Sequence, residues 1–94
     1  MTIRWNSEAA DDFATIVEHL RDANPGAAAK LASLVIRAIE LLDTATVDGP
    51  TFELSDGRTV RGWRCRQLRI YYQRIDDFTV VVRIHDQRRA PIVR

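Results

Sequence analysis

Apolar and polar residues alternate along residues 68–86, and this pattern predicts two adjacent strands. One side of the two strands is apolar and carries Leu68, Ile70, Tyr72, Val80, Val82 and Ile84. The other side is mostly polar and carries Arg69, Tyr71, Gln73, Val81, Arg83 and His85. Successive side chains of a strand point to opposite faces. The pattern therefore predicts a sheet that buries one face and offers arginine, tyrosine and histidine side chains on the other.

The acidic pair Asp76-Asp77 separates these strands, and the length of the loop decides which residues face each other. Facing residues in an antiparallel pair point to the same side of the sheet. A two-residue loop would set Arg69 opposite Ile84 and mix the two faces, whereas a three-residue loop keeps them separate. We therefore expect a three-residue loop. It places four side chains together on the face turned away from the helices: Arg69, Tyr71, Arg83 and His85.

Apolar residues in the first half of the chain recur at helical spacing and predict two helices. Ser7 is a suitable N-cap for the first helix, because acidic residues follow it at the positive end of the helix dipole. Asn24 ends this helix and caps the second, with Pro25 at the first helical position. The second helix stops before Asp48-Gly49-Pro50. Two helices joined so closely should form an antiparallel hairpin.

Shorter segments complete the predicted fold. Three of them are expected to be strands: Thr2–Trp5, Thr51–Leu54 and Arg58–Arg66. Gly62 weakens the last of these or marks a bulge, and the tail from Gln87 to Arg94 is expected to be loose. The predicted fold class is α+β, with a short N-terminal strand, an antiparallel helix hairpin and then a three- to four-stranded antiparallel sheet. Residues 1–94 are expected to form one domain.

Composition indicates an ordinary globular chain of 94 residues, with 46% apolar and 29% charged side chains. No segment has the apolar length needed to cross a membrane, and the N-terminus lacks the apolar run of a signal peptide. We therefore expect a cytoplasmic protein. Cys65 is the only cysteine, so neither an intrachain disulfide nor a Cys/His metal site is expected.

The net charge of +1 conceals a strong division along the chain. Residues 1–57 contain 4 basic and 10 acidic side chains, whereas residues 58–94 contain 10 arginines and 3 aspartates. Arginine binds phosphate oxygens in pairs, which lysine does not do. Some of these arginines should pair with the acidic helices. The excess predicts a basic surface for phosphates or acidic partners.

The order of strand, helix hairpin and antiparallel strands resembles the RelE/ParE superfamily of bacterial type II toxins. Three segments carry the resemblance: Trp5-Asn6-Ser7-Glu8-Ala9 through Asp12, Asn24-Pro25-Gly26-Ala27-Ala28, and Arg69-Ile70-Tyr71-Tyr72 through Arg88-Arg89. Together they cover nearly the whole chain. The resemblance implies a toxin that acts without a cofactor and is neutralised by a small antitoxin encoded beside it.

The superfamily contains two activities, and one is ribosome-dependent mRNA cleavage, found in relatives of RelE and YoeB. On this interpretation the resemblance implies Glu53 as the base, Arg69 as the phosphate stabiliser and His85 as the acid. Asp86 departs from the pattern, because YoeB-like proteins carry an aromatic residue directly after that histidine. A carboxylate at this position repels a nearby phosphate.

The other activity is poisoning of DNA gyrase by ParE-type members, which are not known to be nucleases. The Asn-Pro-x-Ala-Ala start of the second helix and the His-x-x-Arg-Arg ending resemble this branch, which we favour. The residues implied for contact with gyrase or its DNA are Arg61, Arg64, Arg69, Tyr71, Arg83, Arg88 and Arg89. Ile16 and Leu20 on the first helix are expected to contact the antitoxin. A third interpretation is a non-catalytic module that binds a peptide or nucleic acid.

Overall fold

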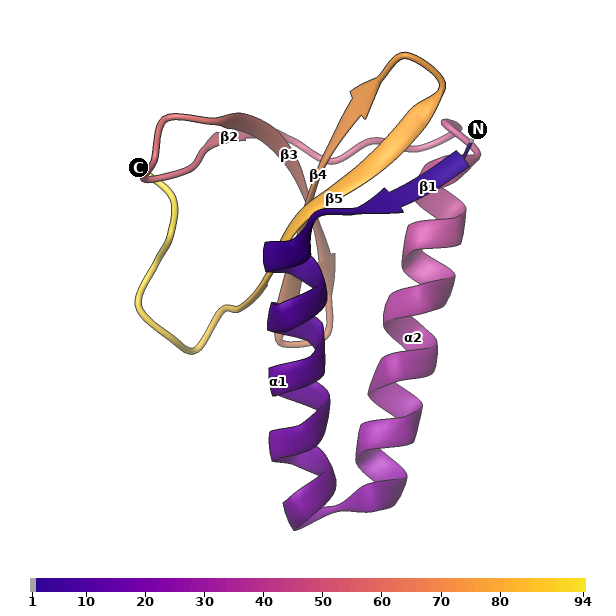
Figure 1. Cartoon of the computed structure of the whole chain (residues 1–94), viewed down its shortest axis with the longest axis vertical. Coiled ribbons are helices and arrows are strands. Elements are labelled where there is room, and N and C mark those ends of the chain that lie inside the picture. Colours follow the sequence, from indigo (N-terminus) through magenta and orange to yellow (C-terminus); the bar gives the residue numbers. More distant parts are fainter. Residues whose placement is uncertain (1) are drawn as a thin grey trace.

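Two helices cover one face of a sheet in the computed structural model, which describes residues 2–94 (Figure 1). In chain order the elements are β1 (Thr2–Trp5), α1 (Ser7–Ala23), α2 (Pro25–Asp43), β2 (Thr51–Glu53), β3 (Thr59–Cys65), β4 (Leu68–Ile75) and β5 (Phe78–Asp86). The helices run side by side, and their far ends extend past the sheet (Figure 1). Within residues 2–94, no helix combines the length and the hydropathy needed to cross a membrane. The α+β class predicted from the sequence is confirmed.

Asparagine residues mark the start of both helices. α1 begins at Ser7, so Asn6 rather than Ser7 is the N-cap, and the Asn6 side chain makes no capping hydrogen bond. Asn24 caps α2 by accepting a hydrogen bond from the Ala27 N–H at 3.1 Å, and Pro25 is the first helical residue. The helix hairpin was therefore predicted correctly from the Asn-Pro pair.

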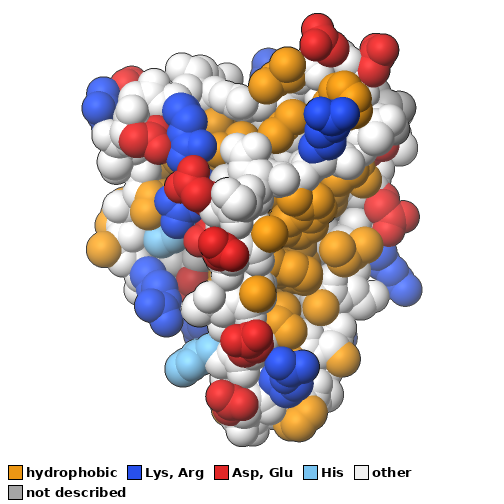
Figure 2. Space-filling view, in the orientation of Figure 1, with side chains coloured by type: hydrophobic (Ala, Val, Ile, Leu, Met, Phe, Trp, Pro, Cys, Tyr) orange, Lys and Arg blue, Asp and Glu red, His pale blue; other side chains and the backbone are white. Residues whose placement is uncertain are grey.

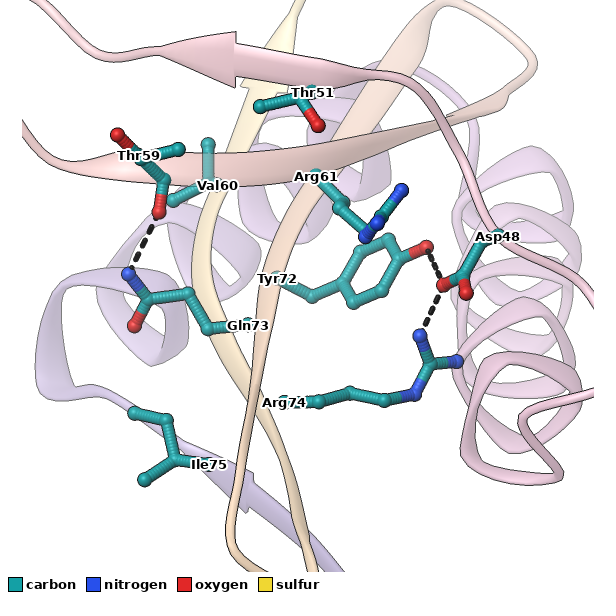
Figure 3. A pocket seen from close by; sticks show the side chains of 9 residues that line it. All are labelled: Asp48, Thr51, Thr59, Val60, Arg61, Tyr72, Gln73, Arg74 and Ile75. Atoms are coloured by element: carbon teal, nitrogen blue, oxygen red, sulfur yellow. Dashed lines mark hydrogen bonds and ion pairs between the residues drawn. The ribbon is translucent and has the colours of Figure 1, made fainter.

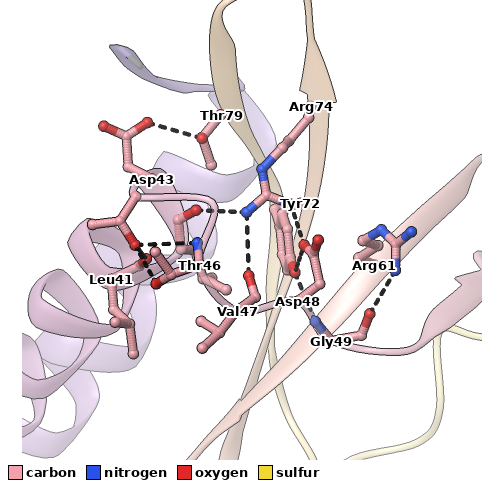
Figure 4. A network of polar contacts seen from close by, with 12 residues as sticks. Leu41, Asp43, Thr46, Val47, Asp48, Gly49, Arg61, Tyr72, Arg74 and Thr79 are labelled. Atoms are coloured by element: carbon pink, nitrogen blue, oxygen red, sulfur yellow. Dashed lines mark hydrogen bonds and ion pairs between the residues drawn. The ribbon is translucent and has the colours of Figure 1, made fainter.

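α2 ends at Asp43, in agreement with the prediction that it stops before Asp48-Gly49-Pro50, and the chain turns sharply after it. Ala45 has a φ of 58°, a left-handed conformation that an α-helix does not continue. The Arg74 guanidinium donates a hydrogen bond to the Leu42 carbonyl at 2.6 Å and also pairs with Asp48 (Figure 4). The end of α2 is thereby attached to β4.

The sheet has five strands in the order β1-β5-β4-β3-β2. β1 pairs with β5 in parallel, whereas the other neighbouring strands are antiparallel. The strands β2 to β5 form the predicted antiparallel sheet of three to four strands, and β1, which was predicted as a separate short strand, adds a fifth strand in parallel. A parallel pair needs a long crossover connection, and here the helix hairpin together with β2, β3 and β4 lies between the two strands.

Apolar side chains form two clusters, one on each face of the sheet. The larger lies beneath the helices and contains Ala9, Leu31, Val35, Ile39, Leu42, Leu68, Ile70, Tyr72, Val81 and Ile84. The smaller lies on the opposite face, called the outer face below, and contains Leu54, Val60, Tyr71 and Val82. Tyr71 and Tyr72 are both fully buried, although alternation predicts burial of Tyr72 alone. Tyr71 and Tyr72 point to opposite faces of β4, and each lies in one of the two apolar clusters, so both are buried.

The loop between β4 and β5 has two residues, Asp76 and Asp77, and not the predicted three, because Ile75 faces Phe78. Regular pairing from such a loop would mix the two faces of the sheet. A β-bulge prevents this outcome.

The bulge shifts the register after Tyr71 and leaves Val82 as the extra residue of β5. Arg69 therefore faces His85, which is one of the two pairings that a three-residue loop would allow; the other sets Arg69 opposite Arg83. The shift also divides residues that alternation had placed together. Val82 joins the outer cluster, whereas Ile84 lies beneath the helices.

The C-terminal tail, residues 87–94, docks against the outer face, so the prediction of a loose tail was wrong. Val93 forms an antiparallel bridge with Leu54, and the Ile92 carbonyl accepts a hydrogen bond from the Ser55 N–H at 2.7 Å. Ile92 and Val93 also pack against the outer cluster. The tail leaves β5 in a wide loop and returns to the edge of β2 (Figure 1).

Candidate anion-binding surface

Three basic side chains form a row across the outer face of the sheet. Arg64 of β3 faces Arg69 of β4, and Arg69 in turn faces His85 of β5. Among residues 2–94, no carboxylate forms an ion pair with Arg64 or Arg69. Like charges directly opposite each other destabilise a sheet. An anion bound here would offset that repulsion, which makes the row a candidate functional site.

Phe52 of β2 and Gly62 of β3 support Arg69 of β4. The guanidinium carbon of Arg69 lies 4.6 Å from the centre of the Phe52 ring, within the range of a cation–π contact. A Cβ at position 62 would lie 2.7 Å from the Phe52 ring and 2.9 Å from the Arg69 Cδ. Gly62 therefore leaves room for both side chains to cross β3. From the sequence, Gly62 predicts only a weak strand or a bulge, and no pattern points to Phe52.

Tyr71 and His85 share the outer face with Arg69 but lie below its surface. Tyr71 is fully buried and His85 is 9% exposed. Neither the Tyr71 Oη nor the His85 Nε2 has a hydrogen-bond partner among the described residues. The expectation of an open polar face was therefore wrong at these two positions. The outer cluster packs around Tyr71, and the tail runs beside His85.

Ion pairs occupy two of the other predicted arginines. Arg83 donates two hydrogen bonds to Asp12 of α1, at 2.7 and 3.1 Å, and this contact raises the pKa of the Arg83 guanidinium. Arg88 pairs with Asp86 at 2.7 Å, and its hydrogen bond lowers the pKa of the Asp86 carboxyl to about 2. Asp86 is therefore neutralised locally and does not face the row. Arg89 is exposed in the tail.

Glu53 is not brought together with Arg69 and His85. It forms an ion pair with Arg94 at 2.7 Å. The preceding residue, Phe52, contacts Arg69 on the outer face, so the Glu53 side chain points to the opposite side of β2. The three residues implied for mRNA cleavage do not converge on one point in this structure.

A cavity of about 720 Å³ lies between α1 and the tail. His85 lines it from β5, and Arg88 and Arg89 line it from the tail. Ile16 and Leu20 line it from α1, where both are half-buried. Residues expected to contact the antitoxin and residues expected to contact the target therefore border the same cavity.

A hollow of about 560 Å³ lies where β3 diverges from β4, and Arg61 lines it (Figure 3). Arg61 donates a hydrogen bond to the Gly49 carbonyl at 3.0 Å. The Tyr72 hydroxyl donates to Asp48 at 2.9 Å, and Asp48 also pairs with Arg74. The Arg74 contact lowers the pKa of Asp48, and burial raises the pKa of Tyr72. These contacts hold the α2–β2 linker in place. Arg61 therefore stabilises this linker, and it lies on the face of the sheet opposite the basic row.

Cys65 lies at the end of β3, outside the basic row. Burial raises the pKa of the Cys65 thiol, which disfavours a reactive thiolate. In the part of the chain that the structure describes, no group of three or more His, Cys, Asp or Glu side chains is arranged to hold a metal ion.

The helix hairpin carries exposed apolar surface. A band of hydrophobic atoms runs between the two helices (Figure 2). On α2, Ile36 and Leu41 are 40% and 43% exposed. A contiguous apolar surface of this kind commonly marks a site of protein–protein contact.

Comparison with known proteins identifies both a family and a shared fold. The family model described as "ParE toxin of type II toxin-antitoxin system, parDE" matches residues 3–91. Among solved structures, a chain of the chromosomal ParDE toxin–antitoxin system from P. aeruginosa matches with a TM-score of 0.72 and 19% sequence identity. The match covers 92% of this chain and 95% of that chain. At this identity the structural likeness shows the fold alone. None of the curated proteins matches.

Proposed function

The chain belongs to the ParE toxin family of type II toxin–antitoxin systems, and we propose that it arrests growth by poisoning DNA gyrase in the cytoplasm. We further propose that a cognate antitoxin neutralises it. The observation that carries the proposal is the row of Arg64, Arg69 and His85 on the outer face, with which no carboxylate of residues 2–94 forms an ion pair.

The row suits contact with gyrase and its bound DNA because it offers positive charge, and Glu53, the residue implied as a general base, does not lie beside it. Phosphate contacts from arginine supply affinity without reading base sequence. The Arg69–Phe52 stack fixes the direction of one guanidinium and reduces the entropy lost on binding.

Purified protein and gyrase provide the test. Arg69→Ala should raise the concentration needed to stabilise gyrase–DNA cleavage complexes by about tenfold, which corresponds to a loss of about 1.4 kcal/mol. Arg37→Ala, which removes an exposed arginine of α2, should act like the wild type. The same order should hold for growth arrest on induced expression. An Arg69→Ala protein that poisons gyrase as well as the wild type would contradict the proposal.

Antitoxin binding is proposed at the cavity beside α1, where Ile16 and Leu20 are accessible in part. Leu20→Glu should weaken rescue by the co-expressed antitoxin while leaving growth arrest by the toxin alone intact. Ala14→Glu places the same charge at an exposed position of α1 and is the matched control. Full rescue of Leu20→Glu would place the antitoxin elsewhere.

The alternative activity, mRNA cleavage, receives no support from the position of Glu53, which is paired with Arg94. A translation extract programmed with a reporter mRNA separates the two activities. The gyrase proposal expects no ribosome-dependent cleavage. Cleavage that disappears with His85→Ala would establish the endonuclease instead.

A further inference from the structure

Two buried polar atoms on the outer face have no hydrogen-bond partner among residues 2–94. They are the Tyr71 Oη and the His85 Nε2, in side chains that are 0% and 9% exposed. Buried polar groups are nearly always paired, and an orphan usually marks a missing ligand, a missing water or a functional constraint. Both atoms belong to residues that share a face with Arg69, and His85 is its direct partner across the strands. The side chains of all three residues therefore start from one face of two neighbouring strands.

The C-terminal tail lies over part of this area. Ile92 packs on the cluster that contains Tyr71 and also lines the cavity that reaches His85. Between β5 and this contact, Arg88 and Arg89 are exposed. The tail thus contacts the residues around Tyr71 and His85 through a few apolar side chains, and most of the residues that connect the tail to β5 are exposed.

The attachments of the tail are concentrated at the edge of β2. The Arg94 N–H donates to the Glu53 carbonyl at 2.8 Å, and the two side chains form an ion pair at 2.7 Å. These side chains are 57% and 50% exposed, so water and salt weaken the pair. A tail that is attached to an edge strand by a few hydrogen bonds and one exposed ion pair should detach more readily than a central strand of the sheet.

We propose that the tail is a hinged cover over a phosphodiester-binding site formed by Arg69, Tyr71 and His85. When the tail leaves β2, a phosphate of a nucleic acid backbone enters. Its oxygens accept the hydrogen bonds that the Tyr71 hydroxyl and the His85 Nε2–H lack in the closed form, while the Arg69 guanidinium balances its charge. This inference rests on the proposed function, since gyrase-bound DNA is the expected source of the phosphate.

Charge favours a phosphodiester over an apolar segment as the occupant. Arg64 and Arg69 face each other without a carboxylate partner, so an uncharged group would leave their repulsion in place. Phosphate oxygens match the planar fork of arginine and also accept from hydroxyl and imidazole donors. A nucleic acid chain adds contacts with neighbouring phosphates, which free phosphate does not have.

A reversible lock on the tail tests the cover directly. Leu54 and Val93 form an antiparallel bridge flanked by hydrogen bonds, the kind of pair whose Cα atoms lie about 4.5 Å apart, which a disulfide can span. In a Cys65→Ser background, Leu54→Cys and Val93→Cys should lock the tail when oxidised and release it when reduced. Binding of a fluorescent single-stranded DNA oligonucleotide is measured in both states.

The oxidised protein should bind the oligonucleotide at least about tenfold more weakly than the reduced protein, and reductant should restore binding. Equal affinity in both states would overturn the cover, and absence of binding in both states would overturn the site. Gyrase poisoning is measured separately. Poisoning without oligonucleotide binding would leave the proposed function standing while this inference falls. Inorganic phosphate at equal concentration should not compete, and strong competition would identify free phosphate as the ligand instead.

Tyr71→Phe tests the orphan hydroxyl in the unlocked protein. It should weaken oligonucleotide binding several-fold while the melting temperature stays the same or rises, because no hydrogen bond is lost in the closed form. A lower melting temperature with unchanged binding would show that the hydroxyl serves only the fold, and would overturn its assignment.

A loosened tail provides a second test that needs no change at the buried Leu54. Arg94→Glu puts two carboxylates together at the attachment on Glu53 and should raise oligonucleotide affinity several-fold relative to Arg37→Glu. The control makes the same charge change on an exposed part of α2. Affinity equal to or below that of Arg37→Glu would contradict the cover.

Discussion

Asp12 is the residue that joins α1 to the last strand. Its carboxylate accepts two hydrogen bonds from Arg83, at 2.7 and 3.1 Å, and one from the Ile84 N–H at 3.0 Å. Asp12→Ala should lower the free energy of unfolding by about 2–3 kcal/mol, because it leaves a half-buried guanidinium and a backbone donor unpaired. Asp11→Ala, at the adjacent exposed position, is the control in urea denaturation. Equal losses in the two variants would refute this role.

Gly62 lacks a side chain at the point where the Phe52 and Arg69 side chains cross β3. Gly62→Ala places a methyl group 2.7 Å from the Phe52 ring, so the Phe52–Arg69 stack must move. Overpacking of this kind should cost about 1–3 kcal/mol and also weaken gyrase poisoning. Gly26→Ala, where the nearest atom of another residue is 3.7 Å away, should change the free energy of unfolding by less than about 1 kcal/mol. A Gly62→Ala protein with wild-type activity would show that the stack is not needed.

The sequence predicts where basic side chains gather more readily than it predicts which carboxylates pair with them. The concentration of arginine after residue 57 indicates a basic surface, and alternation places Arg69 and His85 on one face. Which arginines remain unpaired depends on distant contacts. Arg83 is neutralised by Asp12, 71 positions earlier in the chain, and no local pattern reports such a pair. The support of Arg69 by Phe52 is hidden for the same reason.

At the scale of elements, alternation predicted the strands but not their pairing. A two-residue loop followed by a bulge places Arg69 opposite His85, a pairing that a three-residue loop closed by Ile75 and Thr79 would also give. Both solutions satisfy the separation of polar and apolar faces, so the sequence pattern does not choose between them. The tail was missed because Ile92 and Val93 are too few to show a period. Their docking depends on the outer cluster, whose members Leu54, Val60, Tyr71 and Val82 are far apart in the sequence and meet only in the folded protein.

The turn that starts the tail should respond to acid. The Arg88 hydrogen bond lowers the pKa of the Asp86 carboxyl from 3.8 to about 2. A carboxyl whose pKa is lower in the folded state stabilises the fold above pH 3.8, and this contribution disappears as the pH falls towards 2. Asp86→Asn should therefore lower the midpoint of urea unfolding at pH 6, with a smaller difference from the wild type near pH 2. Asp76→Asn, in the exposed β4–β5 loop, is the control. A difference that persists unchanged at low pH would exclude this ionic contribution.

At the scale of the whole molecule, the order of elements was predictable and the topology was only partly so. Propensity and capping residues reveal a strand, two helices and a series of strands, and this order carries the family resemblance. The parallel pairing of β1 with β5 joins the first and the last strand. It is set by how the helix hairpin lies on the sheet, which no segment of the sequence specifies alone. Burial of β4 on both faces follows from this arrangement together with the docked tail.

The arrangement of the two apolar clusters predicts unequal local stability across the molecule. β4 and β5 lie at the centre of the sheet between both clusters, whereas β2 is an edge strand that only the tail covers. Amide hydrogens of central strands exchange through near-global unfolding, and those of a weakly held edge exchange through local opening. In native-state hydrogen exchange, the amides of Ser55 and Arg94 should therefore exchange much faster than those of β4. Added denaturant should accelerate the β4 amides strongly and the tail amides weakly, because local opening exposes little surface. If the tail and β4 amides instead exchanged with the same rate and denaturant dependence, the sheet would open as one unit and the edge would have no independent motion.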